Sequence, residues 1–409
     1  MSSALSGLRN HQTKIDVIGN DIANVSTVGY KGVATIFSDV LSQTLSGATA
    51  PGGLTGGTNA NQVGLGSRLA GTVQTFAQGA LQRTGRPTDL AIQGDGFFVI
   101  NNGSEQLYTR AGAFSLDGNG NMTTLDGLLV QGWQAVADGS INTNLAMGPI
   151  TIRSGDLLPP EPTSEILVGG NLRSAADIGD ASIMSLTVYD DQGQPGLLTF
   201  TMTKTAANEW TATAEFGDPA VPIALTDNVL TFDASGERIG PADGNMNIAG
   251  GVIPSMSGAI TVELGMPGDS GRMTQYASAE SASVVNQNGS PSGVLTSFDI
   301  GQDGRIVGSY SNGRRGTIGQ LAMATFTNPT GLERLAGSWR TSPNSGLAQV
   351  GVAGAGGRGL ISSGTLEMSN VDLAEEFTQL IIAQRGFQGN ARMITTSDEV
   401  LQEVVNLRR

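Results

Sequence analysis

The sequence predicts a multidomain, mainly β protein with a long α-helix at each end. Apolar residues recur every seven positions near both termini, and proline is absent from the first 50 residues and after Pro343. Short β-branched and aromatic runs, separated by Gly, Asn and Asp turns, fill the chain between them. At roughly 100–200 residues per domain, 409 residues suffice for two to four domains.

The N-terminal 30 residues are expected to form an amphipathic helix. Leu8, Ile15 and Ile22 recur every seven residues, and Ile18 occupies one of the interleaved positions. This is the a/d pattern of a coiled coil, which needs a second helix to cover its apolar side.

The C-terminal segment repeats the pattern, and a helix is expected from Val371 to Arg408, about 57 Å at 1.5 Å per residue. Ser369–Asp372 supplies an N-cap, whereas Gly386 and Gly389 each weaken the helix by about 1 kcal/mol. The apolar residues of both ends form a predicted self-assembly seam, with packing of both helices on the chain's own globular core as the alternative. The seam comprises Leu8, Ile15, Ile18, Ile22, Leu366, Leu373, Phe377, Leu380, Phe387, Ile394 and Leu401.

The chain between the helices is predicted to fold as nested β-domains. Residues 42–71 read as a glycine-rich loop, because they show little hydrophobic periodicity. Strands are expected at 90–92, 96–100, 107–110 and 128–130, followed by a meander at 185–189, 197–203 and 210–216. The predicted organisation is a terminal helical coiled-coil domain (1–30 and 365–409), a Gly-rich connecting segment (31–71), an inner β-domain (72–144 and 284–364) and an inserted outer β-barrel or sandwich (145–283).

The predicted insert is distinguished by its charge. Residues 145–283 hold 17 acidic and 5 basic side chains, a net charge of −12 out of −14 for the whole chain. Ten of the 15 prolines also lie in this segment. A segment so different in composition is expected to be a separate domain that faces solvent.

Composition also excludes several classes of function. A net charge of −14 with three lysines argues against a nucleic-acid partner, which requires clustered basic residues. A single histidine, His11, and the absence of cysteine leave no donor set for thiolate metal sites or His-dependent nucleophilic catalysis. We therefore expect no enzymatic activity, no metal and no cofactor.

Targeting signals are equally sparse. No apolar stretch approaches the ~18 residues of a membrane-spanning helix, so no membrane insertion is expected. No secretory signal peptide is evident, which leaves a cytoplasmic protein or export by a route without a cleavable apolar signal.

Two short motifs are interpreted without a ligand: Gly354–Gly359 as a flexible linker into the C-terminal helix, and Asp117–Asn121 as a turn. Gly354–Gly359 matches the dinucleotide-binding pattern G-x-G-x-x-G, but no parallel βαβ pattern surrounds it. Asp117–Asn121 resembles the start of a calcium loop, but Leu128 stands where that loop needs a glutamate.

Beyond composition, several stretches resemble the bacterial flagellar rod and hook protein family. Both ends and both flanks of the chain carry the likeness, in order, with Asp21 in place of the usual asparagine. The stretches are Ile18–Lys31, Asp89–Ile92 with Gly96–Phe98, Gly304–Asn312, Ser369–Leu373 and Ile382–Gln388.

The insert is similar to that of the hook members of the family, and the distal rod subunit is the alternative. The resemblance implies a curved, self-assembling tubular homopolymer in the extracellular part of the flagellum, which links rod to filament and transmits torque. It also implies the partners: further copies of the chain, the distal rod, the hook–filament junction protein, the hook cap and the flagellar export apparatus.

Overall fold

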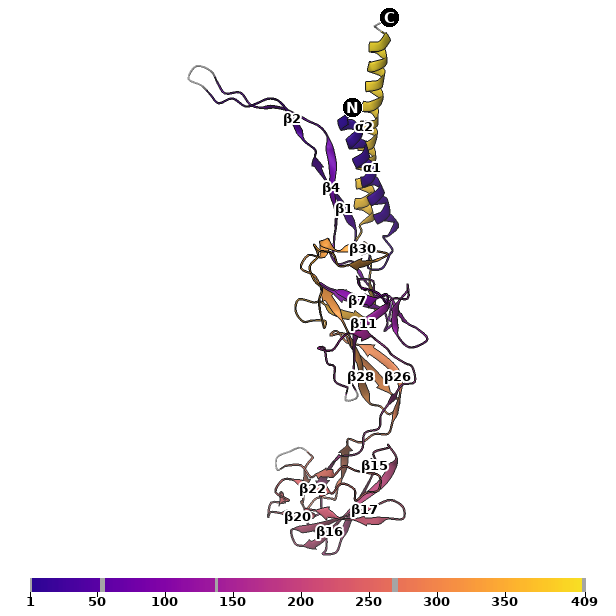
Figure 1. Ribbon diagram of the computed structural model, residues 1–409. Coiled ribbons are helices and arrows are strands. Elements are labelled where there is room, and N and C mark those ends of the chain that lie inside the picture. The colour runs from indigo at the N-terminus through magenta and orange to yellow at the C-terminus, as the bar shows by residue number, and fades with distance from the viewer. Residues whose placement is uncertain (1, 52–55, 137–138, 267–270, 407–409) are drawn as a thin grey trace. The chain divides into compact units, whose positions relative to one another are not determined.

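The computed structural model describes residues 2–51, 56–136, 139–266 and 271–406. The chain divides into two compact units. Unit 1 comprises Met1–Arg153, Phe298–Val307 and Thr317–Arg409, and unit 2 comprises Ser154–Ser297 and Gly308–Gly316. The fold is mainly β with one long helix near each end of the chain, which confirms the predicted class (Figure 1).

The helices α1 (Ser2–Ala23) and α2 (Leu373–Asn406) pack side by side in unit 1 (Figure 1). Gly7 lies against Asn390 and Gly386 against His11, while the Lys14 ammonium donates a 2.8 Å hydrogen bond to Gln379. Rising numbers in α1 meet falling numbers in α2, so the two helices are antiparallel.

α2 begins later than the apolar repeat suggested. Leu366 lies in strand β34 (Thr365–Glu367), which pairs with β5 (Leu81–Arg83), so its placement in the helical seam was wrong. The Asp372 carboxylate accepts a 2.8 Å hydrogen bond from the Ala374 amide and caps the helix there. Leu366 precedes Leu373 by seven residues, but it does not share a helix face with it, because the chain between Leu366 and the cap is not helical.

The interpretation of residues 42–71 as a loop was also wrong. β1 (Val33–Asp39) pairs antiparallel with β4 (Ser67–Gln74), and β2 (Ser42–Ser46) pairs with β3 (Asn61–Gly64). Every residue of β2 and β3 is exposed. Backbone hydrogen bonds hold this ribbon without a buried face, so it carries no alternation of apolar and polar residues.

The rest of unit 1 contains most strands of a 14-stranded sheet, together with a separate two-stranded sheet in which β33 pairs with β6. The predicted strands at 90–92, 96–100, 107–110 and 128–130 appear as β6, β7, β8 and β11. An aromatic cluster fills this core: Phe97 packs edge-on against Trp339 at 5.4 Å and against Phe326 at 5.7 Å.

The strands of unit 1, besides those given above, are β6 (Leu90–Gln93), β7 (Phe97–Asn101), β8 (Gln106–Thr109), β9 (Phe114–Leu116), β10 (Met122–Thr124), β11 (Leu129–Gln134), β12 (Gly148–Pro149), β29 (Met323–Thr325), β30 (Glu333–Leu335), β31 (Ser338–Arg340), β32 (Gln349–Gly351) and β33 (Leu360–Ser363), with a short 3₁₀ turn at Pro329–Gly331.

Unit 2 contains two open sheets around one hydrophobic core. Their strand orders are β19-β22-β23-β14-β24 and β15-β16-β17-β20-β21, with β25 and β18 attached to them. The predicted meander at 185–216 is confirmed as β15, β16 and β17. In β16, Leu198, Phe200 and Met202 alternate into the core. Neither sheet closes on itself among the described residues.

The strands of unit 2 are β13 (Leu157–Leu158), β14 (Glu165–Asn171), β15 (Ala181–Tyr189), β16 (Pro195–Ala206), β17 (Glu209–Phe216), β18 (Val221–Ile223), β19 (Leu225–Thr226), β20 (Val229–Phe232), β21 (Arg238–Gly240), β22 (Asn245–Ile248), β23 (Ile260–Glu263), β24 (Met273–Thr274) and β25 (Ser283–Gln287). β26 (Gly293–Ile300), β27 (Arg305–Tyr310) and β28 (Arg315–Leu321) each contribute residues to both units.

Candidate assembly interface

The apolar repeat of α2 faces α1 along the middle of the pair. Leu380, Phe387 and Ile394 are half-buried there, and Ala383, between them on the same stripe, is fully buried. On α1, Ile18 is buried, and the other predicted seam residues, Leu8, Ile15 and Ile22, are half-buried. The central residues of the predicted seam therefore join the two helices within one subunit.

The remaining helical residues of the seam stay exposed. Leu373 is 40 % exposed, and Phe377 and Leu401 are each 50 % exposed. They belong to two larger apolar groups at opposite ends of α2. We call Leu373, Phe377 and Ile381 the basal patch, and Val400, Leu401, Val404 and Val405 the distal patch.

The helices approach each other closely at glycines. A methyl group added to Gly386 would lie 2.5 Å from the His11 ring, whereas one added to Gly389 would meet no atom within 4 Å. Gly386 is therefore required by packing, which sequence reasoning missed when it treated the two glycines alike.

The Gly386→Ala variant should weaken the helix pair despite alanine's better helix propensity, because overpacking costs about 1–3 kcal/mol. The matched variant Gly389→Ala should stabilise α2 by about 1 kcal/mol. Thermal unfolding followed by the helical circular dichroism signal measures both. Equal shifts in the two variants would show that His11 does not press on Gly386.

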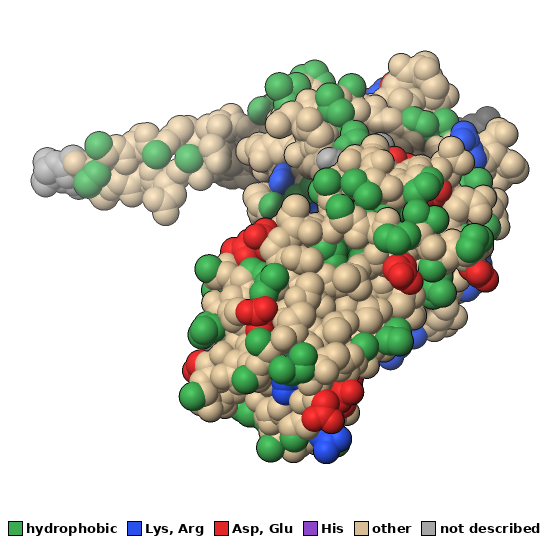
Figure 2. Space-filling view, turned by 90° about the horizontal axis from the view of Figure 1, so that it is seen from below, with side chains coloured by type: hydrophobic (Ala, Val, Ile, Leu, Met, Phe, Trp, Pro, Cys, Tyr) green, Lys and Arg blue, Asp and Glu red, His purple; other side chains and the backbone are tan. Residues whose placement is uncertain are grey.

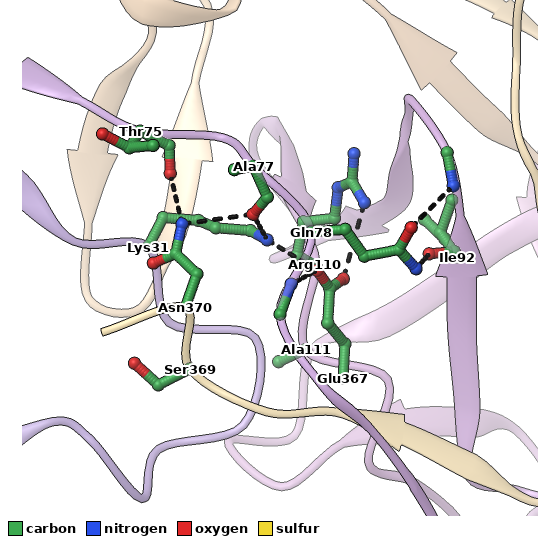
Figure 3. A network of polar contacts seen from close by, with 12 residues as sticks. Lys31, Thr75, Ala77, Gln78, Ile92, Arg110, Ala111, Glu367, Ser369 and Asn370 are labelled. Carbon is green, nitrogen blue, oxygen red and sulfur yellow. Dashed lines mark hydrogen bonds and ion pairs between the residues drawn. The ribbon is translucent and has the colours of Figure 1, made fainter. Parts of the chain in front are cut away.

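Beneath the helices, a buried polar network joins four distant segments of unit 1 (Figure 3). The Lys31 ammonium lies 2.6 Å from the Glu367 carboxylate and donates a 2.8 Å hydrogen bond to the Ala77 carbonyl. Arg110 approaches the other oxygen of Glu367 at 3.4 Å, and the Gly79 amide donates to Glu367 at 3.0 Å. All three charged side chains are almost completely buried.

Burial and charge pairing act in opposite directions on this triad. Burial lowers the pKa of Lys31 below its ordinary value, and its hydrogen bond and charge contact with Glu367 oppose that shift. Burial likewise lowers the pKa of Arg110, again against the attraction of Glu367. Removing Glu367 would leave two cations close together in a dry interior.

Asn370 connects this network to the start of α2. Its side-chain oxygen accepts a hydrogen bond from the Gly32 amide at 2.9 Å. Its amide group donates to the Thr75 and Ala77 carbonyls at 2.8 and 3.1 Å, as Figure 3 shows. The segment that leads into α2 is thereby fixed to the segments around β1 and β4.

Asp21 performs the matching role at the end of α1. Its buried carboxylate accepts hydrogen bonds from the Tyr30 hydroxyl at 2.7 Å and the Val33 amide at 3.0 Å. The guanidinium of Arg334 stacks 4.4 Å from the centre of the Tyr30 ring. Burial, more than its contact with Asp21, raises the pKa of Tyr30.

A cavity of about 390 Å³ lies among α1, β1 and the first turn of α2. Glu376 lines it together with Asp21, Glu375 and Lys14. Burial, followed by the charges of Asp21 and Glu375, raises the pKa of Glu376 above its ordinary value of 4.5, and Lys14 opposes this. The folded state therefore favours the protonated form of Glu376 more than the unfolded chain does.

The Glu376→Gln variant should stabilise the helix pair at pH 7 by less than about 1 kcal/mol, because Glu376 is partly solvated. A raised pKa means that the wild-type side chain contributes most stability below pH 4.5 and loses that contribution as the pH rises through the folded value. The advantage of the variant should therefore vanish below pH 4.5. Urea unfolding at several pH values tests this, with the exposed Glu399→Gln at the other end of α2 as the control. An advantage independent of pH would contradict it.

Sequence reasoning found the helical stripe but missed the polar network. Lys31 is one of three lysines in the chain and directly follows the Gly29–Tyr30 motif, which was a usable signal. The other two members of the triad, Glu367 and Arg110, are 336 and 79 positions away from Lys31, so no local pattern could group the three residues.

Asp117–Asn121 lies in a turn as predicted, whereas the interpretation of Gly354–Gly359 as a linker into the C-terminal helix was wrong, because it joins two strands. Asp117 accepts hydrogen bonds from the amides of Asn119 and Asn121, and Gly354–Gly359 connects β32 to β33. In the described part of the chain, no group of three metal-ligating side chains comes together. No described helix is long and apolar enough to cross a bilayer.

Four family models match the chain in the order expected of one family. They are described as flagella basal body rod protein (residues 1–31), flagellar hook protein FlgE/F/G D1 domain (91–169), flagellar basal body protein FlaE D2 domain (176–290) and flagellar basal body rod FlgEFG protein C-terminal (362–407).

Full-length relatives give the same result. The flagellar hook protein FlgE of Borreliella burgdorferi is 36 % identical over 99 % of this chain and 98 % of the relative, and that of Salmonella typhimurium is 34 % identical over 100 % and 99 %. The flagellar basal-body rod protein FlgG of Bacillus subtilis is 32 % identical over 100 % and 98 %. A crystal structure of the hook protein FlgE2 of Helicobacter pylori shares the fold, with a TM-score of 0.52 and 14 % identity over 70 % of this chain and 100 % of that chain.

Proposed function

The chain belongs to the flagellar hook protein family, and on that basis we propose that it is the subunit of a curved tubular homopolymer that joins the flagellar rod to the filament. Its place is the hook, an extracellular part of the bacterial flagellum. The role is structural rather than catalytic: the tube transmits torque through a flexible joint. The further partners are the distal rod, the hook–filament junction protein, the hook cap and the export apparatus.

The exposed apolar residues of α2 are the observation that carries this proposal. Both patches lie on a helix whose stripe from Leu380 to Ile394 is already covered by α1, while Ile382 and Met393 beside that stripe are exposed as well. Contiguous exposed apolar surface of this kind is typical of an interaction site. Copies of the chain that cover each other's patches would assemble through their helix pairs.

Unit 2 is proposed as the outer domain. It is a β-sandwich inserted into the inner domain, which is built from the chain segments on both sides of the insert. Acidic side chains are scattered over the face drawn in Figure 2 and form no single patch there. Lateral contacts between such surfaces are expected to be small, polar and able to slide, which a bending tube requires. Like charges on neighbouring copies repel each other, and salt screens that repulsion over ~8–10 Å.

The distal rod subunit is the second candidate, because the Bacillus subtilis rod protein FlgG matches over the full chain. The two functions differ in the form of the polymer. A rod is a straight tube, and a hook is a curved one.

Negative-stain electron microscopy after salt-induced polymerisation distinguishes these functions. Curved tubes whose curvature changes with ionic strength are expected. Straight tubes at every salt concentration would favour the rod subunit. Protein that stays monomeric under all conditions would contradict both functions.

A further inference from the structure

α2 extends past the end of α1. It has 34 residues and α1 has 22, a difference of about 18 Å at 1.5 Å per residue. Because Gly7 lies against Asn390 in an antiparallel pair, Ser2 falls opposite about residue 395. The last turns of α2 therefore have no α1 residues opposite them, as Figure 1 shows.

The stripe that α1 covers continues into this free end. Leu401 repeats the position of Ile394 seven residues later, and Val404 repeats that of Ser397. Ile394 and Ser397 are half-buried, whereas Leu401 and Val404 are 50 % and 57 % exposed. The distal patch is thus the uncovered end of an existing helix–helix interface, and a second helix is the element that fits it.

The basal patch offers such a helix. Leu373, Phe377 and Ile381 follow each other at intervals of four, so they form one stripe on the helix surface. They lie beside the α1-facing stripe and are 40–51 % exposed. Both patches belong to the same helix, so a contact between them joins two different surfaces of two copies. Each copy can then bind one neighbour through each patch, and the contact extends from copy to copy instead of ending at a dimer.

We propose that the distal patch of one copy packs against the basal patch of the next copy, with the two α2 helices parallel and displaced by about 39 Å along their axes. The inference rests on the proposed function, because it describes a contact between copies in the tube. Its occupant is a second copy of this chain.

The charges around the two patches set the conditions for this contact. Glu375 and Glu376 flank the basal patch, and Glu399 and Glu403 flank the distal patch, which is followed in the sequence by Arg408 and Arg409. The charges near the two patches in the sequence are of both signs, and salt screens them while leaving the apolar contact intact. The contact should therefore persist at high salt.

The absence of native cysteine makes disulfide trapping a direct test. Phe377→Cys and Val404→Cys are combined in one chain, where the two positions lie about 40 Å apart along one helix and cannot join each other. Every disulfide must then link two copies. The control combines Val404→Cys with Gln388→Cys, which is exposed on the middle of α2.

After polymerisation in high salt and oxidation, the test chain should give a ladder of linked multimers on a non-reducing denaturing gel, and the control should give none. Tubes of the test chain without a ladder, or an equal ladder from the control, would overturn the contact while leaving the proposed function intact.

If the cysteine substitutions themselves prevent tube formation, the critical concentration for polymerisation of Phe377→Asp provides the test. A critical concentration at least tenfold above that of Gln388→Asp supports the contact, and equal values overturn it. A wild-type chain that forms no tubes would overturn the proposed function, and the contact with it.

Discussion

Replacing Glu367 with glutamine is expected to destabilise unit 1 by about 3–5 kcal/mol, because it leaves two buried cations without a compensating charge. Lys31 and Arg110 approach the two oxygens of Glu367 at 2.6 and 3.4 Å and are sealed from solvent. Glutamine keeps the shape of the side chain and one acceptor oxygen. The loss of stability therefore measures the effect of removing the negative charge and not the effect of creating a cavity.

The matched control is Glu333→Gln, which breaks an exposed ion pair with Arg340 at 2.7 Å. An exposed pair of this kind contributes about 0–1 kcal/mol. Urea unfolding followed by tryptophan fluorescence measures both variants in a Trp210→Phe background, since Trp133 and Trp339 then report on unit 1 alone. Equal losses in the two variants would show that the triad is no more important than a surface pair.

The Leu380→Asp variant is expected to separate the helix pair and abolish polymerisation. The new carboxylate would lie on the stripe that α1 covers, where an unpaired charge costs several kcal/mol. Gln384→Asp places the same charge on the exposed side of α2, one turn further on, and should polymerise normally.

The critical concentration for polymerisation measures both α2 variants, and tryptophan fluorescence of the monomer checks that the β units stay folded. Assembly of Leu380→Asp at the wild-type concentration would contradict a role for the covered stripe. If neither variant assembles, any added negative charge on α2 prevents polymerisation, and the position of Leu380 on the covered stripe is not the cause.

The helices were predictable because their seven-residue repeat is a local signal. Leu380, Phe387 and Ile394 recur at that spacing and lie on the stripe that faces α1. The same repeat also included Leu366, because spacing alone does not register the non-helical segment that precedes the cap at Asp372. Which apolar residues α1 would leave uncovered depends on the antiparallel register, which neither helix encodes alone.

The β ribbon and the buried triad were not predictable by the same reasoning. The strands around Ser42–Ser46 bury no face, so they lack the alternation by which strands are found in a sequence. The Lys31–Glu367 pair joins residues 336 positions apart, and only the complete fold brings them together. The positions of both residues beside recognisable terminal motifs were the sole sequence signal.

Amide hydrogen exchange along α2 tests most directly whether other copies cover the exposed apolar faces of this helix. The free end of a helix is marginally stable in water, so amides of residues 398–405 should exchange rapidly in the monomer and be strongly protected in the polymer. Amides of the buried strand β7 should exchange alike in both states. Equal exchange of residues 398–405 in monomer and polymer would contradict assembly through α2.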